Sequence, residues 1–261
     1  MKIVQGTLHF RLASLLAAGV MCALYAAPAR AAGTQQVFDR TYPLQQGGAF
    51  ALGNVNGGVR IEGWDREQVE VKAVKTALHQ SEDLNRVQIE VQSDGDQVGV
   101  NTRYPSGSGV QVTVEYEIHV PYRLRWAAVS TVNGNVHVQG VTGAGTLNSV
   151  NGNVEVVDSD GRFSGITTNG DVRMQLRSLP QGAPVSLRTI NGSVVLSIPQ
   201  GTNLDVRVVN RNGDFRSDFP LTTLGAYTSS RFSGRLGNGG GEIFMSTVNG
   251  AIRLVNGHPV V

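Results

Sequence analysis

The sequence predicts an all-β protein, a single-chain, β-helix-like β-solenoid with coils of about 18–22 residues. Its strongest signal is the dipeptide Asn-Gly, which recurs with steps of 18, 18, 22 and 21 residues between the copies that begin at Asn133, Asn151, Asn169, Asn191 and Asn212. After most copies, apolar and polar residues alternate, which is the period of a strand with one buried and one wet face. The chain contains 33 glycines among its 261 residues. This share is higher than in ordinary proteins, where glycine makes up about 7%, and it indicates many turns.

The residues around Asn-Gly are repeated as well. In one copy Val136 and Val138 are apolar and His137 between them is polar, so the valines should face a core and the histidine should face solvent. Asparagine and glycine both tolerate positive φ, so the pair turns the chain tightly. Copies of the motif occupy residues 53–61, 130–138, 148–156, 167–174, 188–196 and 246–254, with a divergent copy at 212–215.

Strand–turn–strand units of this length fit two architectures. In a meander-type sandwich, each Asn-Gly makes a two-residue hairpin and neighbouring strands run antiparallel. In a solenoid, equivalent strands stack in parallel on the next coil, and the near-identity of successive units favours this arrangement because it places like residues on like. Stacked asparagines can then hydrogen-bond to one another at the strand spacing of about 4.8 Å. The predicted ladders are Val136, Val154, Val172 and Val194 in the interior, and Asn133, Asn151, Asn169 and Asn191 at the corner.

Residues 1–31 predict a signal peptide rather than a part of the fold. The basic residues Lys2 and Arg11 come before an uncharged apolar run. After the run, Ala29-Arg30-Ala31 fits a small-x-small cleavage site. The run of about 16 residues is short for a membrane-spanning helix, which needs roughly 20. A retained anchor is the alternative. A lipid anchor at Cys22, the only cysteine, is disfavoured because the bulky Met21 precedes it.

Residues 32–261 are then expected to form one β-solenoid domain, with longer, irregular coils over 32–126 and tight Asn-Gly repeats over 127–261. A short helix is expected at Ser81–Arg86, with Ser81 as its N-cap. The leader holds three of the 22 basic residues and none of the 20 acidic ones, so the mature chain has nearly balanced charge. Such a chain offers no basic stripe for nucleic acid, and no later apolar run is long enough to span a membrane.

The order of the motifs resembles a known family. Gly63-Trp64-Asp65 follows the first Asn-Gly, a Val-Glu-Val strand comes next, and a later strand ends at Val120-Pro121. Tandem Asn-Gly-[Asn/Asp]-Val repeats follow, then Gly-Gly-Gly and a final Ser-Thr-Val-Asn-Gly-x-Ile. Over residues 48–257 this order is similar to the bacterial "putative adhesin" family of exported β-solenoid domains of unknown function. The family carries no accepted catalytic residues, so the resemblance implies none here.

Acidic residues are candidate catalytic groups because β-solenoids include enzymes that cleave polysaccharides, with carboxylates clustered on one face. Asp158-Ser-Asp160-Gly161 is interpreted as a turn in which aspartate bonds to its own backbone. Asp171 and Asp214 follow their Asn-Gly pairs, in a slot that other repeats fill with asparagine or serine. We therefore predict no catalytic residue, whereas an acid cluster inside a groove would favour an enzyme.

No metal or cofactor site is predicted. The histidines after the leader, which are His79, His119, His137 and His258, show no metal-ligand spacing. Residues 237–244 resemble a Ca²⁺-binding nonapeptide, but the motif occurs once and has Glu242 in place of aspartate. The aromatic residues of the less regular part either stack on sugars or, as we prefer, cap the open end of the solenoid; they are Trp64, Tyr104, Tyr116, Tyr122 and Trp126.

The function predicted from the sequence is that of a non-enzymatic exported protein in the periplasm or at the cell surface of a bacterium. Its long faces would serve as a scaffold or as an adhesin-like surface for an envelope glycan or an envelope protein, with contacts from Arg173, Arg188, Arg207 and Arg253. A β-helix enzyme acting on envelope or extracellular polysaccharide is the alternative. Self-association through stacked ends is a third possibility, and the sequence does not identify the ligand.

Overall fold

The computed structural model describes residues 33–106, 109–180, 184–225, 228 and 230–257. The predicted signal peptide, Cys22 and His258 lie outside the described residues. The chain from Gly33 onward forms one compact unit. Over the described residues, no helix has both the length and the apolar character needed to cross a membrane.

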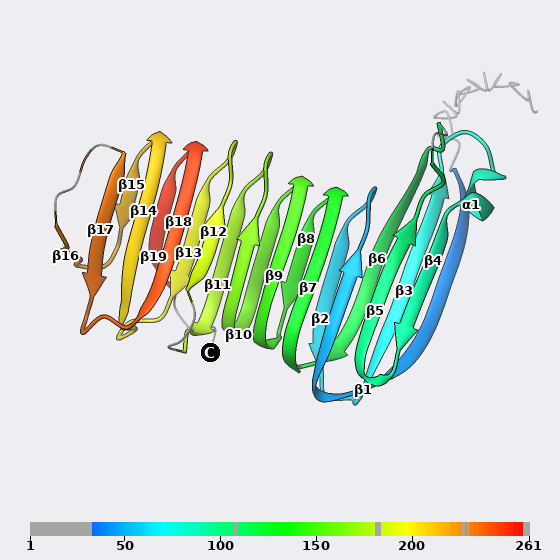
Figure 1. Ribbon diagram of the computed structural model, residues 1–261, viewed down its shortest axis with the longest axis horizontal. Coiled ribbons are helices and arrows are strands. Elements are labelled where there is room, and N and C mark those ends of the chain that lie inside the picture. Colours follow the sequence, from blue (N-terminus) through cyan, green and yellow to red (C-terminus); the bar gives the residue numbers. More distant parts are fainter. Residues whose placement is uncertain (1–32, 107–108, 181–183, 226–227, 229, 258–261) are drawn as a thin grey trace, which may run out of the picture. The chain divides into compact units, whose positions relative to one another are not determined.

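The described unit is built almost entirely of strands (Figure 1). The first half contains β1 (Thr34–Gly53), β2 (Val59–Trp64), β3 (Gln68–Ala77), α1 (Asp83–Arg86), β4 (Gln88–Ser93), β5 (Gly95–Arg103), β6 (Val112–Pro121), β7 (Arg123–Asn133), β8 (Val136–Gln139) and β9 (Thr142–Asn151). The second half contains β10 (Val154–Ile166), β11 (Val172–Ser178), β12 (Val185–Arg188), β13 (Val194–Ile198), β14 (Leu204–Asn212), β15 (Phe215–Ser217), β16 (Thr222–Thr223), β17 (Arg231–Leu236), β18 (Gly241–Asn249) and β19 (Ile252–Asn256).

The repeats stack in parallel and in register, which confirms the two predicted ladders and excludes hairpins at Asn-Gly. Val136 lies opposite Val154, Val154 opposite Val172, and Val172 opposite Val194, and all four side chains are fully buried. The asparagine ladder is longer than predicted. It runs through Asn56, Asn133, Asn151, Asn169, Asn191, Asn249 and Asn212, with carboxamide hydrogen bonds of 2.7–2.8 Å between successive members.

The expectation of an open β-solenoid is wrong, because the sheet closes on itself. Hydrogen-bonded pairs lead from β1 through β3, β6, β2, β8, β10, β9 and β7 and back to β1, which makes an eight-stranded barrel. Long strands cause the closure. The start of β10 pairs with β8 and its end pairs with β9, and β1 pairs with β3 at its start and with β7 at its end.

In the part where longer, irregular coils were predicted, 32–126, the described strands pair mostly antiparallel. Strand β3 runs antiparallel to β1 and β6, and β4 runs antiparallel to β5. A tight turn joins β4 to β5, and in it Asp94 Oδ1 accepts hydrogen bonds from the backbone N–H groups of Asp96 and Gln97. The short helix is confirmed at Asp83–Arg86, but its N-cap is Glu82, which makes no side-chain cap bond, rather than Ser81.

The last repeat is placed out of sequence order. Strand β18 lies between β12 and β14, and β19 lies between β13 and β15. Along the chain, the outer strands around residue 212 therefore come before residues 241–256, although residues 241–256 lie between those strands and the repeat at 191. Nothing in the spacing of the Asn-Gly pairs indicates this insertion.

Glycine is required at the turns because neighbouring turns touch. Gly170 has a φ of +151°, and a Cβ added there would collide with the carbonyl of Gly152 in the adjacent repeat. A Cβ on Gly152 would meet the carbonyl of Gly134 in the same way, and one on Gly192 would meet that of Gly170. The glycine thus serves both the turn and the close approach of two backbones.

A third ladder lies inside the corner and was not predicted. One buried hydroxyl per repeat donates to the carbonyl of the turn glycine in the neighbouring repeat, at 2.7–3.0 Å. The donors are Thr131, Ser149, Thr167, Thr189 and Thr247. At the two ends of this ladder the larger Asn54 and Asn210 donate to two backbone carbonyls each.

We predict that Gly170→Ala lowers the free energy of unfolding by about 3 kcal/mol, because the methyl group meets backbone that cannot move aside. Gly99→Ala in β5 is the matched control, since a Cβ there has open space, and its effect should stay within about 0.5 kcal/mol. Equilibrium denaturation measures both. Equal effects of the two variants would contradict the contact between turns.

We predict that Thr167→Val lowers the free energy of unfolding by about 1–2 kcal/mol, because it removes the buried bond to the carbonyl of Gly152 without changing the side-chain shape. Thr168→Val, one residue further along the same segment, changes a half-buried side chain that makes no hydrogen bond in the described residues. The second variant should unfold like the wild type in the same denaturant titration. A neutral Thr167→Val would show that the inner ladder contributes little.

Candidate functional site

The four candidate acids are each held in a structural role. Asp158 occupies a turn with a φ of +48°. Asp160 accepts from Ser178 and pairs with Arg177, and Asp214 pairs with Arg216. Within the described residues, no group of three or more His, Cys, Asp or Glu side chains is arranged to hold a metal ion.

The residue directly after each Asn-Gly pair, which we call the slot residue, forms a further ladder. The backbone N–H of Asn153 donates to Asn135 Oδ1, that of Asp171 donates to Asn153 Oδ1, and that of Ser193 donates to Asp171 Oδ1, all at 2.7–2.8 Å. The interpretation of Asp171 as a turn residue is therefore confirmed. The slot needs a side-chain oxygen, and asparagine and aspartate both supply it.

The remaining predicted residues are dispersed over the surface. His137 pairs with Glu155 at 3.0 Å, and His119 pairs with Glu70 at 3.0 Å while stacking on Trp64 at a ring distance of 5.1 Å. His79 is exposed. Glu242 pairs with Arg207 at 3.4 Å, and Arg188 lies 4.5 Å from the ring centroid of Phe244.

The aromatic residues that were predicted to cap the solenoid or to stack on sugars differ in their burial. Tyr116 is buried beneath β6, Trp64 and Tyr104 are half-buried, and Tyr122 is 36% exposed. The side chain of Trp126 lies outside the described residues. The structure instead places Tyr116 below a hollow that the sequence did not predict.

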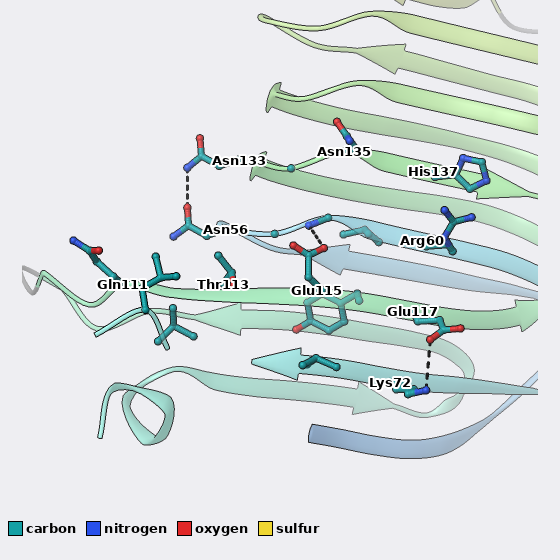
Figure 2. Close-up of a pocket in the computed structure, with 18 of the residues that line it drawn as sticks. Asn56, Arg60, Lys72, Gln111, Thr113, Glu115, Glu117, Asn133, Asn135 and His137 are labelled. Carbon is teal, nitrogen blue, oxygen red and sulfur yellow. Dashed lines mark hydrogen bonds and ion pairs between the residues drawn. The ribbon is translucent and has the colours of Figure 1, made fainter. Parts of the chain in front are cut away.

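This hollow is a groove on the outer face of β2, β3, β6 and β8, and we call it the groove (Figure 2). Its volume of about 950 Å³ falls in the upper range of small-molecule sites. Its polar lining includes Asn56, Arg60, Lys72, Gln111, Thr113, Glu115, Glu117, Asn133, Asn135 and His137, and its apolar lining includes Val74, Leu78 and Val110. Gly57, Gly58 and Gly134 also line the groove and contribute only backbone atoms to it.

The charges of the groove are balanced and paired across strands. Glu117 pairs with Lys72 at 3.6 Å, and Arg60 lies opposite Glu117 on one side and His137 on the other. The alternation continues through Glu155 and Arg173 on β10 and β11. Exposed pairs of this kind stabilise the protein little.

Two tyrosines support the strands beneath the groove. The hydroxyl of Tyr116 shares a 2.7 Å hydrogen bond with Thr102, and that of Tyr104 donates to the carbonyl of Val112 at 3.0 Å. Burial raises the pKa of Tyr116 to about 12 and likewise raises the pKa of Tyr104 to about 12. Both hydroxyls are therefore neutral hydrogen-bonding groups at physiological pH.

No protein-family model matches the sequence, and comparison with curated proteins finds no relative. Among solved structures, a putative cell adhesion protein from Clostridium sporogenes is 10% identical, with a TM-score of 0.48 over 85% of this chain and 100% of that one. A putative adhesin from Bacteroides fragilis is 12% identical, with a TM-score of 0.38 over 85% and 97%. A putative lipid binding protein from Parabacteroides distasonis is 10% identical, with a TM-score of 0.33 over 85% and 98%. Two of these names match the adhesin resemblance of the sequence, but likenesses this distant carry no argument about function.

We predict that alkaline pH destabilises the protein through its buried tyrosines. A folded pKa of about 12 against an ordinary value of 10.0 means that the stabilising contribution is complete below pH 10 and is lost as the pH rises toward 12. The free energy of unfolding should therefore fall over this window, and it should fall less steeply in Tyr116→Phe. Tyr122→Phe, a change at an exposed tyrosine, is the control and should retain the slope of the wild type.

Proposed function

We propose that this chain is an exported, non-enzymatic binding protein of the bacterial envelope, which uses the groove to hold an envelope glycan or an envelope protein. The observation that carries the proposal is the groove itself, a hollow of about 950 Å³ with both polar and apolar walls. Gln111 and Thr113 line it, and their side chains make no hydrogen bond within the described residues, so they are free to bind a partner.

The chemistry of the groove supports binding rather than bond cleavage. Glu115 accepts the backbone N–H of Gly58 at 2.7 Å, and Glu117 is paired with Lys72. Both carboxylates are thus engaged within the protein. They nevertheless lie in one groove, and two carboxylates are the minimum for glycoside hydrolysis. A polysaccharide-cleaving enzyme is therefore the second candidate function.

We predict that the protein, produced with its own leader and purified, co-sediments with isolated bacterial envelopes. Thr113→Arg fills the groove and should weaken this retention by about tenfold. Thr146→Arg is the matched control because Thr146 is a half-buried, outward-facing hydroxyl on β9, outside the residues that line the groove. Protease treatment of the envelopes distinguishes a protein partner from a glycan.

Retention that Thr113→Arg and Thr146→Arg affect equally would remove the groove from the proposal. Release of soluble sugar from the envelopes by the wild type would identify an enzyme instead, and Glu115→Gln and Glu117→Gln should then abolish that release. If no envelope fraction retains the protein, the proposed function is wrong.

A further inference from the structure

The slot ladder is interrupted where it reaches the groove. In the repeats at 133, 151, 169 and 191 the residue after Asn-Gly carries a side-chain oxygen or hydroxyl, but in the repeat at 56 this residue is Gly58. Asn135 lies next to Gly58 in the stack, and its backbone N–H would donate to an oxygen at that position. Within the described residues this N–H has no acceptor.

A side chain at position 58 would come within reach of the Asn135 N–H once the flexible end of Glu115 moves aside. An ideal Cβ built on Gly58 lies 3.9 Å from the backbone nitrogen of Asn135, which is within reach of an oxygen one or two bonds further out. The position lies on the rim of the groove, between Gly58 and Asn135. An oxygen atom of a bound molecule can therefore occupy the place that Asn135 Oδ1 occupies for Asn153.

A second donor, the terminal amide of the asparagine ladder, lies at the same end of the groove (Figure 2). Every carboxamide bond of the asparagine ladder donates toward Asn56, from Asn212 at the far end to Asn133 beside it. Asn56 Oδ1 accepts the last bond, and the Asn56 side chain also lies within hydrogen-bonding reach of the Tyr104 hydroxyl, which lowers the pKa of Tyr104 against the larger effect of burial. Because hydrogen bonds in a chain polarise one another, this terminal amide is a strengthened donor.

Glu115 selects the kind of oxygen that can bind. One carboxylate oxygen of Glu115 already accepts the N–H of Gly58 at 2.7 Å and lies 2.9 Å from a Cβ built on Gly58, so the carboxylate borders the interrupted position. An anionic oxygen there would be repelled by Glu115. A hydroxyl can donate to Glu115 and accept from Asn135 at once, which neither a carbonyl nor a phosphate oxygen can do.

We infer that this end of the groove binds the hydroxyl groups of a neutral oligosaccharide. The balanced charges of Arg60, Lys72, Glu115 and Glu117 suit an uncharged ligand, and Leu78, with 58% of its surface exposed, offers an apolar wall for the carbon face of a sugar. The inference rests on the proposed function and specifies its ligand class and its site.

The test uses the purified full chain and three uncharged probes, maltohexaose, cellohexaose and the hexamer of N-acetylglucosamine, titrated by calorimetry. At least one probe should bind saturably in the micromolar to millimolar range. Gly58→Asn should weaken that binding by about tenfold or more, because its own side-chain oxygen would take the N–H of Asn135 and fill the position. The only close contact of the new Cβ is the flexible end of Glu115.

Asn56→Ala and Asn212→Ala form a matched pair of variants. Each removes one terminal bond of the asparagine ladder, but only Asn56 lines the groove. Sugar binding should weaken several-fold in Asn56→Ala and stay unchanged in Asn212→Ala. This pair keeps the test decisive if Gly58→Asn does not fold.

Three outcomes would overturn the inference. Sugar binding that Gly58→Asn and Asn56→Ala leave unchanged would place the sugar elsewhere. Binding of inorganic phosphate but of no neutral probe would reverse the assigned ligand class. Retention on envelopes without binding to any probe would remove the oligosaccharide and leave the proposed binding function standing, whereas loss of both would remove both.

Discussion

The structure depends on the contact between turns of successive repeats. From Gly134 onward, each turn glycine lies against the carbonyl of the glycine in the adjacent repeat, and no Cβ fits between them. At that spacing the asparagine before the glycine reaches its neighbour at 2.7–2.8 Å, and the threonine or serine two residues earlier reaches the neighbouring glycine carbonyl. One backbone distance therefore allows two sets of hydrogen bonds, between the asparagine carboxamides and from the hydroxyls to the glycine carbonyls, and brings the valines of adjacent strands into one core.

The groove lies where this regularity ends. On one side the repeat at 56 has no further repeat beside it. Its strand β2 pairs there with β6, which in turn runs antiparallel to β3. The N–H of Gly58 therefore donates to Glu115 on β6, where in other repeats it would donate to the residue after an Asn-Gly pair. The glycine at 58 then leaves the N–H of Asn135 without its acceptor. Unused hydrogen-bonding capacity and the hollow thus share one cause, the junction between two kinds of sheet.

The acids of this protein are held in two kinds of place, the turns with their cross-strand pairs, and the groove. Acids that resembled catalytic candidates in the sequence serve the turns and cross-strand pairs, as Asp160 and Asp171 do. The acids that do share a hollow, Glu115 and Glu117, come from a part of the chain where the sequence drew attention only to alternation. A period-two pattern shows which residues face solvent, but it cannot show where that solvent-facing side is hollowed.

The sequence by itself determined the all-β class, the parallel stacking of Val136, Val154, Val172 and Val194, and the asparagine ladder. The reason is that every repeat has the same alternation of buried and exposed residues, so that in-register stacking places identical residues next to each other. Tertiary structure alone decided three things: the closure of the sheet through β1 and β10, the insertion of residues 241–256 out of order, and the groove. All three depend on which strand becomes the neighbour of which across more than one repeat. Local periodicity is the same for every such pairing and therefore does not distinguish them.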